Sequence, residues 1–182
     1  MRELRWPIGM AVAMFAMTVV VVASNYLVQY PVNDWVTYGA FTYPIAFLVT
    51  DLTNRVFGAN KARWVVFIGF SLAVVFSSYF ATPRIAAASG CSFLLAQLCD
   101  VFLFDKLRRA AWWRAPLISS SIASLLDTVL FFTLAFIGTG LPWITWAVGD
   151  YTVKLFVAVI MLLPFRLLMP ATRPVSLTTE IK

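Results

Sequence analysis

Six long apolar runs dominate the chain and constrain what it can fold into. They span residues 6–26, 38–57, 63–81, 84–104, 116–137 and 143–169, and each is close to the roughly 20 residues that a helix needs to cross a bilayer. Because 62% of the residues are hydrophobic and only 12% are charged, the chain lacks the polar surface of a water-soluble globule. The sequence therefore predicts an all-α integral membrane protein, a bundle of six transmembrane helices, with residues 1–182 forming a single polytopic domain.

The first run has a second interpretation. It follows two arginines and could be a signal peptide, with Val21 and Ala23 marking a cleavage site. Its length and its continuation into Asn25 and Tyr26 favour a spanning helix instead. The loops and tails together hold about 60 residues, which leaves no room for a domain outside the membrane.

Positive charges are distributed unevenly between the two sides of the predicted bundle. All but two of the 14 lysines and arginines fall in the N-terminal tail, in the loops after the second and fourth runs, or at the C-terminal end. Cytoplasmic loops carry the excess of Lys and Arg, so we expect both termini in the cytoplasm, as an even number of spans requires. Because these cations sit in short clusters between apolar runs, the net charge of +6 does not indicate a nucleic-acid partner.

Four aspartates stand inside or at the margins of the apolar runs, where a bilayer penalises charge: Asp51, Asp100, Asp127 and Asp150. An ionisable group at the centre of a bilayer costs at least about 2.5–3.5 kcal/mol, and it typically faces the protein interior at a functional site. We therefore expect a polar cavity within the bundle.

Helical spacing predicts ion pairs for two of these acids. Asp150 precedes Lys154 by four residues and Asp51 precedes Arg55 by the same interval, which is the favourable order for a pair within a helix. Each pair either neutralises itself to permit insertion or leaves one member to a ligand. Asp127 has no cation within one turn of its own helix, so it must pair across helices, bind a proton or contact a ligand.

A second polar group offers the hydrogen bonds that a planar base requires. Gln97 and Asp100 are three residues apart and share a helix face. An amide beside a carboxylate suits a ligand with adjacent N–H donors and a carbonyl, as at the edge of guanine. Asp100 could instead pair with Lys106 or Arg108 at the end of its helix.

Other polar and aromatic residues have two interpretations each. Arg84 either extends to the outer interface or closes the mouth of the cavity, and Asn25 either joins helices or contacts a ligand. The serines of the fifth run, 119–121 and 124, favour close helix packing. Six aromatic side chains are candidates to stack on a planar ligand: Tyr43, Phe47, Phe131, Phe132, Trp146 and Tyr151.

The composition also argues against several kinds of chemistry. The chain has no histidine and only two cysteines, so we expect no metal site, no cofactor and no Ser–His or Cys–His catalytic pair. It has no glycine-rich loop ending in Gly-Lys-Ser or Gly-Lys-Thr, the motif with which nucleotide-driven motors hold ATP. We therefore expect a protein that is not an enzyme.

Several short motifs occur in order between residues 23 and 165. They include Tyr43-Pro44, Thr50-Asp51-Leu52 with Arg55, Arg84-Ile85-Ala86, Ala96-Gln97 with Asp100-Val101, Asp127-Thr128, and Asp150-Tyr151 with Lys154. In this combination the chain resembles the queuosine precursor transporter family, also called the vitamin uptake transporter family. The resemblance implies a multi-pass protein of the cell inner membrane, similar in architecture to the substrate-binding subunits of energy-coupling-factor transporters. It also implies import of 7-deazaguanine bases, either the cyano and aminomethyl precursors of queuosine or queuine.

The resemblance places the polar cavity residues at family positions. Our candidate substrate-binding residues are Asn25, Tyr43, Asp51, Arg84, Gln97, Asp100, Phe131, Asp127, Trp146, Asp150 and Lys154. Pro44 and the polar end of the second run indicate that this run is the moving or broken helix of the bundle. One departure is that only Thr82-Pro83 joins the third and fourth runs, where family members often have a longer segment.

Three functions remain open from the sequence. The first is a self-sufficient importer of a deazapurine base, driven by protons through an unpaired aspartate or by metabolic trapping after facilitated entry. The second is a substrate-binding subunit for another vitamin, working with a separate ATPase and coupling protein. The third is a membrane enzyme or scaffold, for which the sequence supplies buried acids but no recognisable nucleophile.

Overall fold

The structure of the chain, a computed structural model, describes residues 2–27, 30–33, 35–80, 82–170 and 172, without the side chains of 2–6, 25, 31, 73, 77 and 80. The helices are α1 (Arg2–Leu27), α2 (Gly39–Thr42), α3 (Pro44–Phe57), α4 (Ala59–Phe80), α5 (Pro83–Leu107), α6 (Arg114–Phe136) and α7 (Trp143–Leu168). Five helices of the described part, α1, α4, α5, α6 and α7, are long and apolar enough to cross a membrane. The predicted all-α bundle is confirmed. The remaining predicted span, residues 38–57, consists of the two shorter helices α2 and α3.

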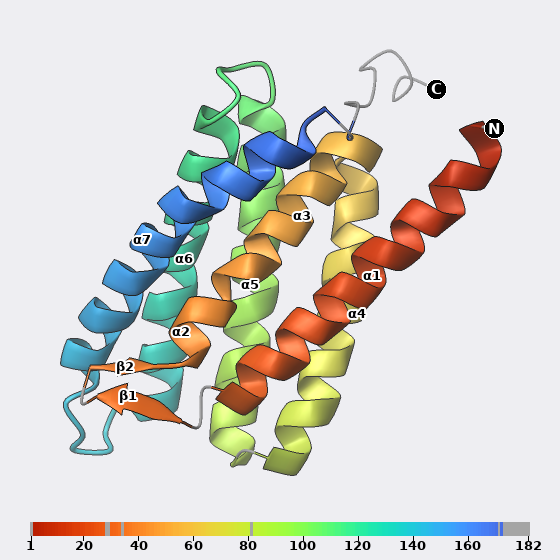
Figure 1. The fold of residues 1–182 in the computed structure, drawn as a ribbon. Coiled ribbons are helices and arrows are strands. Elements are labelled where there is room, and N and C mark those ends of the chain that lie inside the picture. Colours follow the sequence, from red (N-terminus) through yellow and green to blue (C-terminus); the bar gives the residue numbers. More distant parts are fainter. Residues whose placement is uncertain (1, 28–29, 34, 81, 171, 173–182) are drawn as a thin grey trace.

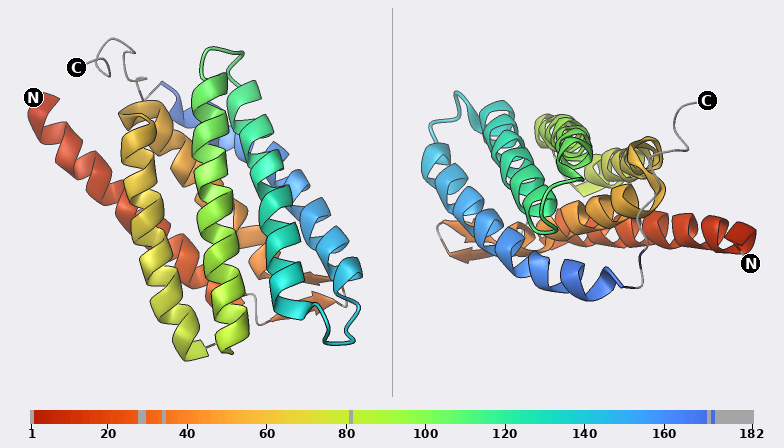
Figure 2. Two further views of the ribbon diagram at one scale, coloured as in Figure 1. Left: turned by 180° about the vertical axis from the view of Figure 1, so that it is seen from behind. Right: turned by 90° about the horizontal axis from the view of Figure 1, so that it is seen from above.

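The helices run up and down between two ends of the bundle (Figure 1). The chain begins and α7 ends at the same end, as an even number of passages requires. Figure 2 shows α4, α5 and α6 as neighbours on one side of the bundle. Helix α3 lies at the centre, in contact with α1, α4, α5, α6 and α7, so its side chains can meet residues from most of the protein.

The predicted second run is divided where Pro44 follows Tyr43. Proline has no backbone N–H and its ring crowds the preceding turn, so it fits the first position of a new helix. The Tyr43 amide still donates to Gly39 O at 2.9 Å, which completes α2 just before α3 begins. The predicted break is therefore confirmed as a division of this helix into α2 and α3, while Tyr43 between them keeps a helical backbone with φ −57° and ψ −40°.

Helix α4 begins earlier than the predicted third run. Gly58 ends α3 with a φ of 85°, a conformation that glycine adopts without steric cost. A single residue therefore reverses the chain, and α4 starts at Ala59. Lys61 and Arg63 consequently lie in the first turns of α4, and Gly58 alone remains as the loop between the second and third runs.

A short hairpin between α1 and α2 was not expected from the sequence. Strands β1 (Pro31–Asn33) and β2 (Val36–Thr37) pair in antiparallel orientation at the end of the bundle opposite the termini (Figure 1). The Asn33 side-chain oxygen accepts from the backbone N–H groups of Trp35 and Val36 at 2.8 and 3.0 Å, as asparagine does in tight turns. Two strands of this length carry too little periodic signal to be recognised in an apolar sequence.

The hairpin packs closely on α7, and this contact yields a stability prediction. A Cβ atom at Gly149 would lie 2.7 Å from the backbone oxygen of Trp35. Gly149→Leu should therefore lower the free energy of unfolding by about 1–3 kcal/mol, as overpacking does elsewhere. The measurement is thermal unfolding of the purified variant in detergent. Val148→Leu, at a position that is 59% exposed, is the control and should leave the midpoint unchanged; equal midpoints for both variants would contradict the contact.

Buried side chains separate the bundle into an apolar part and a polar part. The apolar part lies among α1, α3, α4 and α5, with Met17, Ala46, Val65 and Phe93 in one cluster. The polar part lies where α3 faces α5, α6 and α7, and it contains all four predicted aspartates. Large apolar side chains such as Phe15 point outward, in keeping with a lipid-facing surface.

Candidate functional site

A buried ion cluster joins α6 and α7. Lys154 lies between two acids, with its Nζ 2.8 Å from Asp127 Oδ2 and 2.6 Å from Asp150 Oδ2. The Thr128 hydroxyl donates to Asp150 Oδ2 at 2.8 Å and accepts from Lys154 at 3.2 Å. The predicted pair of Asp150 with Lys154 is confirmed, and of the three options left open for Asp127 the structure selects pairing across helices.

Tyr43 extends this cluster to the central helix. Its hydroxyl donates to Asp127 Oδ1 at 3.0 Å, and Lys154 Nζ lies 5.1 Å from the centre of its ring. We call Tyr43, Asp127, Thr128, Asp150 and Lys154 the Lys154 cluster. Its polar groups contact one another, so its acids are already partnered.

A second polar group, at the interface of α3 with α5, is left incomplete. The Thr50 hydroxyl lies 2.6 Å from Gln97 Oε1, while Gln97 Nε2 and both carboxyl oxygens of Asp100 are buried without a hydrogen-bond partner among the described residues. Gln97 and Asp100 are both fully buried. Since buried polar groups are nearly always paired, these unpartnered atoms need an explanation.

Asp51 connects this group to a cavity. Its carboxyl lies against that of Asp100, and Ser119 and Ser120 approach both acids; the two hydroxyls are 3.5 and 3.4 Å from the Asp51 oxygens. These contacts are long for hydrogen bonds between two oxygen atoms. Asp51 is therefore buried beside a second carboxyl and holds only weak hydrogen bonds.

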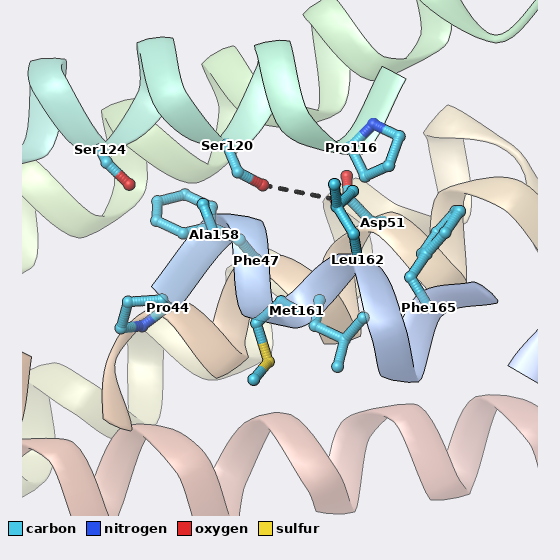
Figure 3. A pocket seen from close by; sticks show the side chains of 11 residues that line it. Pro44, Phe47, Asp51, Pro116, Ser120, Ser124, Ala158, Met161, Leu162 and Phe165 are labelled. Carbon is cyan, nitrogen blue, oxygen red and sulfur yellow. Dashed lines mark hydrogen bonds between the residues drawn. The ribbon is translucent and has the colours of Figure 1, made fainter. Parts of the chain in front are cut away.

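The cavity lies between α3, α6 and α7 (Figure 3). Its polar lining consists of Asp51, Ser120 and Ser124, and its apolar lining includes Phe47, Met161 and Phe165. The Ser124 hydroxyl is buried without a partner in the described part of the chain. The cavity volume is about 10 Å³, which is room for about one water molecule. A planar base therefore needs one of these helices to move before it can enter.

The ion pairs that helical spacing allowed for Asp51 and Asp100 are not formed in the described part of the chain. In the described structure Asp51 makes no ion pair with Arg55: its oxygens lie nearest Ser119 and Ser120 of α6, whereas Arg55 lies near Arg108 at the end of α3. Asp100 likewise makes none with Lys106 or Arg108. Arg108 pairs with Asp105 at 2.7 Å instead. Both acids are thus left without the neutralising partners that the spacing allowed.

Other predicted site residues lie apart from these groups. Arg84 is exposed and donates to Leu134 O at 2.9 Å and to Ile137 O at 2.6 Å, so it satisfies carbonyls at the end of α6. Phe131 and Trp146 both pack against Phe136. Asn25 lies in α1, but its side chain is outside the described part of the structure.

The sequence did not single out every residue that lines the cavity. Ser120 and Ser124 were expected to serve helix packing, and Met161 and Leu162 were not considered. The signal for the serines was present: they are four residues apart and share a face of α6 with Asp127. A row of small polar residues beside a buried acid indicates a polar lining as well as a helix contact.

This arrangement defines a class of protein. Buried charges and unpartnered polar groups around a cavity between membrane helices are typical of transport proteins. The family model for vitamin uptake transporters matches residues 37–82 and 77–169. The chain belongs to the vitamin uptake transporter family, a family of transporters and not of enzymes.

Curated relatives support this assignment. The queuosine precursor transporter of Escherichia coli strain K12 is 35% identical over 174 residues, covering 80% of this chain and 79% of that protein. A protein of Haemophilus influenzae named probable queuosine precursor transporter is 34% identical over 186 residues, with the same coverage. A Bacillus subtilis protein with that name is 26% identical over 156 residues, covering 69% of this chain and 68% of its own. No solved structure matches the chain.

Proposed function

We propose that the protein imports 7-deazaguanine bases, the cyano or aminomethyl precursors of queuosine or queuine, across the inner membrane. The names of the relatives support the substrate class. The observation that carries the proposal is the set of unpartnered atoms at the interface of α3 with α5. The Asp100 carboxyl has only Asp51, Ser119 and Ser120 beside it and no well-formed hydrogen bond, so it can accept from a ligand, and Gln97 Nε2 contributes free donors.

These atoms complement a guanine-type edge. Such an edge presents two neighbouring N–H donors and one carbonyl acceptor, and a carboxylate can accept from both donors while an amide N–H reaches the carbonyl. A site built in this way rejects bases that leave its buried groups unpaired. Phe47 lines the adjacent cavity and provides an aromatic face for stacking.

The proposed recognition site requires movement of the bundle. The base enters by way of the cavity beside Asp51, whose wall on the α7 side is formed by Met161 and Leu162. The break between α2 and α3 at Pro44 supports movement of α3 relative to α7. With both termini in the cytoplasm, as the distribution of Lys and Arg indicates, release occurs toward the end of the bundle where the termini lie.

Ligand discrimination in a thermal-unfolding assay tests this proposal. Purified protein in detergent should be stabilised by 7-cyano-7-deazaguanine, by about 2.7 kcal/mol when the ligand is present at 100 times its dissociation constant. 7-Deazaadenine should give no shift, because it lacks the N–H and carbonyl that Asp100 and Gln97 would contact. Equal shifts for both bases, or none for the first, would contradict recognition at this edge.

A second measurement separates a self-sufficient importer from a subunit of a larger transporter. The protein reconstituted alone into liposomes should take up the labelled base. If uptake requires a copurifying ATPase and coupling protein, the chain is a substrate-binding subunit instead.

A further inference from the structure

Two arginines meet where α3 and α5 end, outside the proposed transport site. Arg108 Nη2 donates to Asn54 O at 2.9 Å and to Asn54 Oδ1 at 2.6 Å, and it pairs with Asp105 at 2.7 Å. The Arg108 side chain is only 10% exposed. Its guanidinium therefore lies against the last turn of α3, next to the residue that follows Asn54.

That residue is Arg55, which is half-buried and repels Arg108 electrostatically. The Nε atoms of both arginines are buried and have no hydrogen-bond partner among the described residues. Two neighbouring cations with unused N–H donors are unfavourable unless an acceptor with negative charge joins them. Asp105 balances one of the two charges, but it contacts Arg108 and is 40% exposed.

We propose that Arg55 and Arg108 form a binding site for a phosphate group. Guanidinium N–H groups match phosphate oxygens in geometry and charge, and basic pockets between membrane helices bind lipid headgroups. Trp112 and Trp113, the last two residues before α6, hold Arg166 and Arg114 over their rings at 5.0 and 5.4 Å. Tryptophans mark the level of the headgroups, so the phosphate belongs either to an anionic phospholipid or to a free phosphate in the cytoplasm.

The test compares anions and lipids on the full-length protein. Wild-type protein is placed in nanodiscs of phosphatidylcholine alone or with phosphatidylglycerol, and in phosphatidylcholine with inorganic phosphate or chloride at equal ionic strength. Phosphatidylglycerol or inorganic phosphate, which carry a net negative charge where zwitterionic phosphatidylcholine does not, should raise the unfolding midpoint by at least about 3 °C. A shift with phosphatidylglycerol alone identifies the lipid, and a shift with inorganic phosphate identifies the free ion.

Arg55→Gln should abolish this shift. It should also leave the midpoint in pure phosphatidylcholine with chloride unchanged or higher, because the repulsion with Arg108 is removed. Arg109→Gln removes an exposed cation nearby and should keep the shift. No shift in any wild-type condition, or an equal shift in Arg55→Gln, overturns the proposal. The readout is binding, so its failure leaves the transport proposal untouched.

Discussion

Lys154→Met is expected to destabilise the protein by about 3–5 kcal/mol, the usual effect of removing one partner from a buried ion pair. The substitution leaves Asp127 and Asp150 facing each other across α6 and α7 without the cation that now lies within 2.8 Å of both. Two uncompensated carboxylates in a buried site repel each other and lose their hydration. The measurement is the yield of monodisperse protein in detergent together with its unfolding midpoint.

Neutralising the whole cluster should recover much of this loss. The triple variant Lys154→Met, Asp127→Asn, Asp150→Asn removes the stranded charges, and replacing a buried ionic group as a unit is often neutral or stabilising. Lys106→Met is the control, since Lys106 is an exposed cation that rests on the Phe102 ring at 4.3 Å. If the single and triple variants are equally unstable, Lys154 does not neutralise Asp127 and Asp150 in the folded protein.

Asp100→Asn is expected to separate stability from transport. The change preserves shape and removes one of two buried carboxyls that lie against each other, Asp51 and Asp100, so the unfolding midpoint should hold or rise. Uptake of 7-cyano-7-deazaguanine should fall at least about 100-fold, because an amide presents one acceptor where the base offers two donors. Uptake of labelled base by cells that lack their own transporter measures this loss.

A change of ligand preference makes the same variant more informative. The asparagine side chain in Asp100→Asn would present one acceptor and one donor, which complement the N1–H and O2 of 7-deazaxanthine. We therefore expect 7-deazaxanthine to stabilise Asp100→Asn and not the wild type. Asp105→Asn, on the same helix but 40% exposed, should retain wild-type uptake and preference. Wild-type uptake by Asp100→Asn would remove Asp100 from the recognition site.

The periodic features of the chain were predictable, and the contacts between helices were less so. Apolar length alone located the helices, and Pro44 alone located the break before α3. The spacing of Asp150 and Lys154 indicated a pair that forms, whereas the identical spacing of Asp51 and Arg55 indicated one that does not. Spacing places two residues on one helix face, but the neighbouring helix decides their partners: α6 offers serines to Asp51, and Arg55 ends beside Arg108.

The cavity could not be derived from the sequence for a related reason. A serine on a membrane helix serves close packing and polar lining equally well, so its role depends on which helix it faces. Ser124 faces the cavity, and its hydroxyl is unpartnered among the described residues. The β-hairpin was missed because its short strands depend on the local turn at Asn33 and on contact with α7.

The single-residue connection at Gly58 limits how the bundle can move. The Gly58 amide donates to Asn54 O at 3.0 Å, and the Gly58 carbonyl accepts from Ala62 N at 3.1 Å. Backbone hydrogen bonds therefore tie Gly58 to both α3 and α4. If α3 tilts away from the cavity, as the proposed transport requires, we expect the near end of α4 to move with it. Because α4 borders the lipid, spectroscopic labels on its outer face would report the opening of a site they do not touch.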